Sequence, residues 1–147
     1  MLQQIKKLLS KAQRLQWYET YWIFDLHGTL IKPSHNHDLS QIEWYPHAKE
    51  CLQILSKRDD IKLILWTSSY PHELVHFLNE FKSSDIRFSY INKNPEINSK
   101  HFGWYEEKFY FDLMFEDKAG FNPEEFKEIL DFLKSEDFLK PDISWKK

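Results

Sequence analysis

The sequence predicts an α/β fold in which a central parallel sheet is flanked by helices. Short apolar runs rich in β-branched and aromatic residues alternate with amphipathic helical patterns along the chain, which is typical of parallel sheets. No internal repeat, low-complexity segment or interdomain linker interrupts this alternation. The runs predicted as strands are residues 21–24, 61–66, 86–91 and 109–115.

Composition predicts one domain over residues 1–147, because a chain that is 41% hydrophobic and 17% aromatic can bury one sizeable core. Its 20 basic and 23 acidic residues leave a net charge of −3, so a broad nucleic-acid-binding patch is not expected. The single Cys51 excludes an intramolecular disulfide and is interpreted as a small buried side chain on a helix. Without an apolar run of about 20 residues or a signal peptide, we expect a soluble, cytoplasmic protein with no membrane partner.

The first element is an amphipathic helix over residues 2–16. Its apolar positions recur at helical spacing and its basic residues fall on the other face; the apolar positions are Leu2, Ile5, Leu8, Leu9, Ala12 and Leu15. A basic amphipathic helix suits a membrane surface or a partner protein. The preferred interpretation is a helix packed on its own sheet with a solvated basic face.

The following elements alternate as far as the end of the chain's core, at about residue 135. Strand 21–24 stops at Asp25 and is followed by a loop over residues 32–41, and Pro46 opens a helix over 47–57. Strand 61–66 precedes a helix that begins at Pro71; its expected inward residues are Leu74, Val75, Leu78 and Phe81. Strand 86–91 and an irregular segment lead to strand 109–115, and Asn122-Pro123 starts the last helix, whose expected inward residues are Phe126, Ile129, Leu130 and Leu133.

Polar side chains follow every predicted strand. They are Asp25 after the first, Thr67 and Ser68 after the second, Asn92 and Lys93 after the third, and Glu116 and Asp117 after the fourth. Because the carboxyl ends of parallel strands meet at one edge of the sheet, we expect these residues to form one site.

The segment YWIFDLHGTL, residues 21–30, resembles the first motif of the haloacid dehalogenase (HAD) superfamily, Asp-x-Asp-Gly-Thr after an apolar strand. His27 stands where the family has its second aspartate. The strings ILWT and WTSS resemble the second motif, and FDLMFED resembles the acidic fourth motif. The resemblance covers about residues 20–135 and implies a Rossmann-like three-layer fold. The gaps between Thr29 and Pro46 and between the second and third strands are too short for a cap domain.

The resemblance also implies a role for each strand-end residue. Asp25 is the expected nucleophile that forms an aspartyl phosphate, and Thr67, Ser68 and the third-motif lysine bind the phosphoryl group. Lys93 is preferred as that lysine and Lys100 is the reserve. Lys108 is excluded because an extended strand from 109 would place it at the opposite edge of the sheet.

A magnesium ion is expected between Asp25, the backbone carbonyl of His27 and Asp117, with Glu116 in support, since Mg²⁺ prefers oxygen ligands. Isolated histidine pairs at His35 and His37, and at His72 and His76, lack the further ligands that a zinc site requires.

His27 decides between two functions. The family's second aspartate protonates the leaving group and then activates water, and an imidazole can do the same near neutral pH. The favoured function is therefore Mg²⁺-dependent phosphomonoester hydrolysis of a phosphorylated substrate, with an open site that suits even macromolecules. The alternative is a catalytically impaired HAD-fold protein that binds phosphate, metal or a protein partner.

Overall fold

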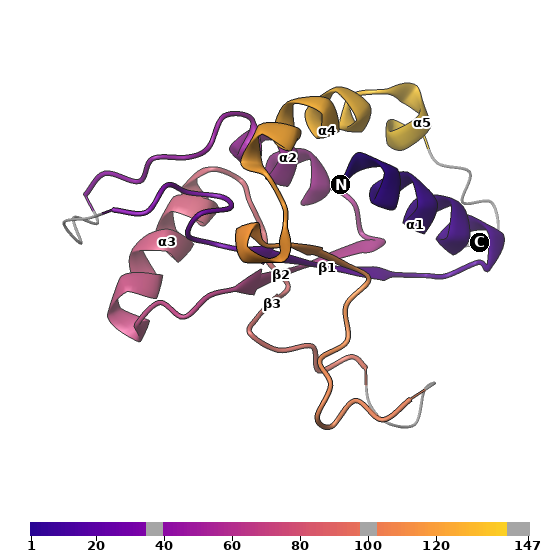
Figure 1. Ribbon diagram of the computed structural model, residues 1–147, viewed down its shortest axis with the longest axis horizontal. Helices are drawn as coiled ribbons and strands as arrows, with labels where there is room; N and C mark the ends of the chain where they lie inside the picture. Colours follow the sequence, from indigo (N-terminus) through magenta and orange to yellow (C-terminus); the bar gives the residue numbers. More distant parts are fainter. Residues whose placement is uncertain (35–39, 98–102, 141–147) are drawn as a thin grey trace.

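A computed structural model describes residues 1–34, 40–97 and 103–140 (Figure 1). Its centre is an all-parallel sheet of four strands in the order β3-β2-β1-β4. The strands are β1 (Thr20–Asp25), β2 (Ile61–Trp66), β3 (Tyr90–Ile91) and β4 (Leu113–Phe115). Asp25 is in register with Trp66, and Phe24 with Phe115, so the two central strands and β4 end at the same edge.

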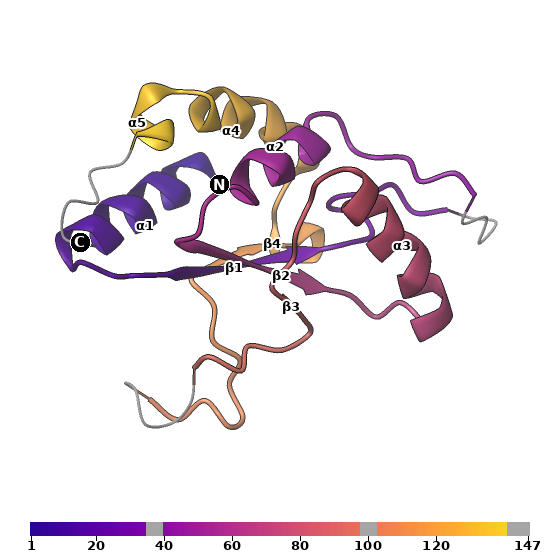
Figure 2. The ribbon, with the colours of Figure 1, turned by 180° about the vertical axis from the view of Figure 1, so that it is seen from behind.

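The helices gather on one face of this sheet. In Figures 1 and 2 the helices α1 (Leu2–Arg14), α2 (Ala48–Leu55), α4 (Phe126–Leu133) and α5 (Glu136–Leu139) lie above the strands. Helix α3 (Pro71–Ser83) joins the same core through Phe77 and Phe81. Two short 3₁₀ turns, η1 (Asp117–Ala119) and η2 (Pro123–Glu125), connect β4 to α4.

The second face of the sheet is covered by the connection between β3 and β4. Tyr21, Ile23 and Ile64 are buried there under side chains of this connection, which include Ile97, Phe109 and Tyr110. The α/β fold with a central parallel sheet is therefore confirmed. In the described part of the chain, the layer opposite the helices is a connection rather than a helix, and neither connection at the carboxyl edge contains a cap domain.

Both outer strands are shorter than predicted. The segment 86–89 is not a strand, because the chain turns at Asp85 (φ 57°) and Ile86 donates its N–H to Phe81 at 2.9 Å, which closes the end of α3. The segment 109–112 is not a strand either. Asp112 donates its backbone N–H to the Tyr21 carbonyl at 2.8 Å, but its carboxylate accepts the Tyr21 N–H at 2.8 Å, so a side chain takes the place of one ladder bond at this point.

Most helix predictions are confirmed, with shifts at particular side chains. Asn122 caps the turn into α4, since its Oδ1 accepts the Glu124 N–H at 3.0 Å. Helix α3 buries Phe77 and Phe81 instead of the expected stripe, so the prediction was wrong for Val75 (55% exposed) and Leu78 (36% exposed). Other differences are that α1 ends at Arg14, that Leu15 is exposed, and that α2 begins two residues after Pro46, at Ala48.

Cys51 is buried in α2, where its Sγ donates to the Phe126 carbonyl at 3.6 Å, and burial raises the pKa of this thiol to about 12. This environment confirms the expected role as a small core side chain. Over the described ranges, every helix is too short or too polar to span a bilayer.

Candidate active site

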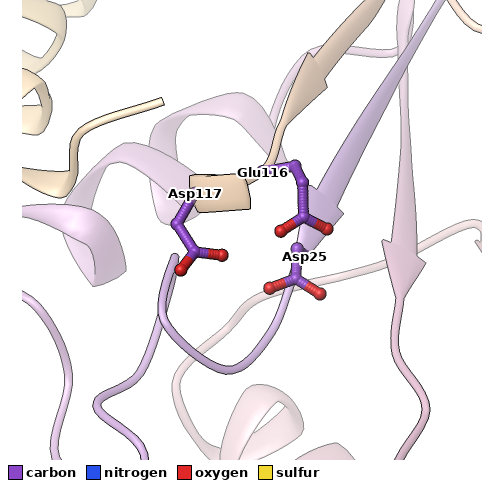
Figure 3. Close-up of side chains that lie close together, drawn as sticks. All are labelled: Asp25, Glu116 and Asp117. Carbon is purple, nitrogen blue, oxygen red and sulfur yellow. The ribbon is translucent and has the colours of Figure 1, made fainter. Parts of the chain in front are cut away.

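Three carboxylates converge at the carboxyl edge of the sheet. Asp25 ends β1, while Glu116 and Asp117 follow the neighbouring strand β4 (Figure 3). One oxygen of each carboxylate lies within 4.8 Å of an oxygen of the other two. The prediction that Asp25 and Asp117 share one edge is therefore met, and Glu116 belongs to the same cluster.

The turn after β1 positions Asp117 directly. Gly28 has φ 86°, and a Cβ at this residue would lie 2.7 Å from Asp117 Oδ2, so any side chain here would collide with the carboxylate. The next residue, Thr29, is fully buried, and its Oγ1 accepts the Asp117 N–H at 3.1 Å. The Gly-Thr pair therefore joins the ends of β1 and β4; sequence reasoning identified it only as a turn and overlooked Thr29 as a positioning residue.

The cluster disfavours its own negative charge. The pKa of Asp25 is raised from its ordinary value of 3.8 to about 6, first by burial and then by the Glu116 and Asp117 carboxylates, while the Leu26 N–H and Lys118 act to lower it. The pKa of Glu116 is also raised, first by burial and then by a hydrogen bond with Asp117. A hard divalent cation that takes oxygen ligands, such as Mg²⁺, would relieve this repulsion, so the donor set fits that metal.

We expect Asp25→Asn to stabilise the metal-free protein at neutral pH. Since the folded-state pKa of Asp25 is raised to about 6, the folded protein binds more protons than the unfolded chain between about pH 4 and pH 6. Stability therefore rises as the pH falls through this window, and ionised Asp25 is a cost above it. After discounting for solvent around a partly exposed group, the gain is about 1 kcal/mol. Thermal unfolding in EDTA measures it at pH 7.5 and at pH 4, where it should vanish; equal gains at both values would contradict the prediction.

Thr67 is held at the end of β2 by Asn92. The Asn92 Oδ1 accepts the Thr67 N–H at 2.8 Å, and its Nδ2 donates to the Thr67 carbonyl at 2.7 Å. Asn92 adopts φ 53°, a conformation that asparagine tolerates better than most residues, and its own N–H donates to the Leu65 carbonyl. The Asn92 amide thus continues the sheet beyond the two residues of β3. Sequence reasoning placed Asn92 at this edge without giving it this role.

A hydrogen-bonded chain runs from Thr67 to His27. The hydroxyls of Thr67 and Ser69 are 2.8 Å apart, and Ser69 Oγ lies 3.2 Å from His27 Nε2. The imidazole also meets the Phe77 ring edge to face, with centroids 5.3 Å apart. Partial burial lowers the pKa of His27, with a smaller opposing effect from the Glu73 carboxylate. His27 is therefore an oriented, largely neutral imidazole at neutral pH.

A cavity of about 280 Å³ adjoins the strand ends on the His27 side. Ser68, Ser69 and Tyr70 from the end of β2 and the start of α3 form one part of its lining, with Phe77 and Glu73 of α3. The remaining lining comes from the turn and connection after β1; these residues are His27, Ile31, Lys32, Pro33, Ser34, Gln41, Ile42 and Glu43.

The role predicted for Lys93 stays a prediction. Lys93 is exposed and lines a hollow against the C-terminal half of α3, which shares no residue with the cavity at His27. Lys100 lies outside the described residues. The argument that excluded Lys108 is wrong, because β4 starts only at Leu113 and Phe109 packs on Trp66 with centroids 5.1 Å apart.

Lys118 is a cation that sequence reasoning missed. Its charge lowers the pKa of both Asp25 and Glu116, and its N–H donates to Glu116 Oε1 at 3.2 Å. Its place directly after the acidic pair was the available signal. Away from the acidic cluster, His72 and His76 are exposed on α3 and join no metal-ligand group among the described residues; His35 and His37 lie outside them.

Comparison with known proteins supports the fold. The chain is similar to a solved structure of a conserved protein from Bacteroides thetaiotaomicron, with a TM-score of 0.57 and 24% sequence identity; the match covers 79% of this chain and 90% of the other. No protein-family model matches the chain, and a search of curated proteins finds no match. At this identity the likeness extends to the fold alone.

Proposed function

We propose that the protein is a Mg²⁺-dependent phosphomonoester hydrolase of the HAD type that works through an aspartyl phosphate on Asp25. The observation that carries this proposal is the convergence of Asp25, Glu116 and Asp117 within 4.8 Å at the carboxyl edge of a parallel sheet. Ligands of open α/β sheets bind at this edge. The match of residues 21–30 to the first HAD motif supplies the nucleophile.

The residues divide the work as follows. A carboxylate oxygen of Asp25 attacks phosphorus, and the bond from phosphorus to the leaving oxygen breaks. Mg²⁺ held by Asp25, Asp117 and Glu116, with the His27 carbonyl, would offset the charge of the phosphoryl group. Thr67 and Ser68 lie on the same edge to bind phosphoryl oxygens, and Lys118 adds positive charge beside Asp25. His27 then accepts a proton from the water that hydrolyses the aspartyl phosphate.

The competing function is binding of phosphate, metal or a protein partner by a catalytically impaired HAD-fold protein. His27 in the position of the second aspartate is the observation that favours it, since partial burial lowers the pKa of the imidazole and leaves little of its acid form at neutral pH. The proposed hydrolase has the stronger support, because a purely structural domain gains nothing from a carboxylate whose pKa is raised by burial and by its acidic neighbours.

Magnesium binding is the first test. We expect isothermal titration to show one Mg²⁺ site in the parent and a loss of at least about tenfold in affinity in Asp117→Ala, because one of three convergent carboxylates is removed. Asp131→Ala is the matched control, since Asp131 is exposed on α4 and pairs with Lys127. Equal affinity in the parent and in Asp117→Ala would reject the metal assignment.

A further inference from the structure

The cavity beside His27 is built differently from the acidic cluster. Its walls are mainly apolar, with Ile31 and Phe77 each only 3% exposed and Ile42 and Pro33 beside them. It shares His27, Ser68 and Ser69 with the strand ends. His27 lies two residues after Asp25 and Ser68 directly follows Thr67, so this cavity adjoins the proposed phosphoryl site and is the space that we assign to the rest of the substrate.

The charges around the cavity disfavour a second anion. Among its described lining residues Lys32 is the one lysine or arginine, and it forms an ion pair with Glu43. Glu73 adds a further carboxylate, whose oxygen accepts the Tyr70 N–H at 3.1 Å. A second phosphate or a carboxylate would therefore meet net negative charge and apolar walls.

Two aromatic side chains, Phe77 and Tyr70, are among the residues that line the cavity. Phe77 packs edge to face with His27, and Tyr70 is 68% exposed in the lining, with its ring stacked on His72 at 5.8 Å. The volume of about 280 Å³ falls just below the range of about 300–1,000 Å³ that is usual for drug-sized ligands. A single aromatic ring fits within this space.

Building on the proposed function, we infer that this cavity is a leaving-group pocket for an uncharged ring, so that the preferred substrates are phosphate monoesters of phenols. In the reaction, an Asp25 oxygen bonds to phosphorus and the phenolic oxygen departs with the electron pair of the broken bond. Water then hydrolyses the aspartyl phosphate and restores Asp25. A phenol, with a pKa of about 10, leaves more readily than an aliphatic alcohol, so it depends less on a donated proton.

Binding of a non-hydrolysable probe tests the pocket without requiring turnover. With Mg²⁺ present, we expect phenylphosphonate to bind about tenfold more tightly than methylphosphonate, measured by NMR titration. Tyr70→Ala should remove most of this preference because the ring loses its stacking partner. The matched control is Tyr18→Ala, which removes a tyrosine that is also 68% exposed but lies outside this cavity, and it should keep the full preference.

Steady-state kinetics test whether the pocket disfavours a charged ring. We expect kcat/KM for phenyl phosphate to exceed that for 4-carboxyphenyl phosphate by about tenfold, and Tyr70→Ala to narrow the gap between phenyl and isopropyl phosphate. Equal binding of the two phosphonates, or equal effects of the two tyrosine variants, would reject the assignment of this cavity as a leaving-group pocket. Turnover of phosphate esters with equal phosphonate binding would leave the hydrolase standing without this pocket. A ring preference that depends on Tyr70, without turnover of any ester, would support the pocket and reject the hydrolase.

Discussion

Asp25→Asn is expected to lower phosphatase turnover by at least about 10⁴-fold, because the nucleophilic oxygen of the proposed reaction is lost. Its position leaves no obvious substitute: it is the last residue of β1, with Glu116 and Asp117 around it at the carboxyl edge. An assay with phenyl phosphate and excess Mg²⁺ measures the loss.

The control is Asp131→Asn, which makes the same chemical change on the exposed face of α4 and should leave turnover unchanged. Because Asp25→Asn is also expected to stabilise the metal-free protein, its inactivity cannot be attributed to unfolding, and a thermal melt of the same sample checks this. Turnover by Asp25→Asn within tenfold of the parent would eliminate the aspartyl-phosphate mechanism.

The residues that follow the strands are the part of the site that could be predicted from the sequence. Strand β1 and strand β2 are continuous apolar runs, so their ends at Asp25 and Trp66 are visible in the sequence. Parallel pairing then brings the residues after them to one edge, together with Glu116 and Asp117. This reasoning needs only the periodicity of the strands and the direction of the chain.

The parts that sequence reasoning missed depend on side chains that replace backbone pairing. The carboxylate of Asp112 accepts the Tyr21 N–H in place of one ladder bond before β4, while the Asn92 amide binds both backbone groups of Thr67 and extends the sheet after β3. Propensity alone reads residues 109–112 as part of a longer strand, and it reads residues 86–89 in the same way although the turn at Asp85 closes the end of α3 there. The exclusion of Lys108 failed because it measured distance along an extended strand from residue 109, whereas β4 is only three residues long.

The orientation of α3 shows a second limit. Leu74, Val75, Leu78 and Phe81 form a plausible apolar stripe, yet the buried pair is Phe77 and Phe81. Phe77 packs against the His27 ring, a contact with a residue 50 positions away that helical periodicity cannot reveal. The contact with His27 is therefore part of the environment that buries Phe77, and it sets which face of α3 is turned inward.

Substitutions at His27 separate an active hydrolase from an inactive relative. If imidazole replaces the missing carboxylic acid, His27→Ala should lower turnover by about 10²- to 10⁴-fold, the usual contribution of general acid and base assistance. Magnesium affinity should stay near that of the parent, because the proposed ligand from this residue is its backbone carbonyl. His27→Asp should hydrolyse phenyl phosphate at least as fast as the parent, since the shorter carboxylate supplies the acid and base of the first motif that residues 21–30 resemble. His76→Ala, on the exposed face of α3 and outside the lining of the cavity, is the control for loss of an imidazole.

The lowered pKa of His27 affects the two steps of the proposed reaction, attack on the ester and hydrolysis of the aspartyl phosphate, in different ways. A neutral imidazole is a ready base for the water that attacks the aspartyl phosphate, but a poor acid for the leaving group. A parent with real turnover should therefore show its largest His27→Ala loss in hydrolysis of the intermediate, measured by rapid quench. If the parent and His27→Ala are equally inactive and His27→Asp is active, the natural protein is the impaired binding protein. If His27→Asp is also inert with Mg²⁺ and several phosphate esters, phosphate-ester hydrolysis is not the function of this fold's carboxylate cluster.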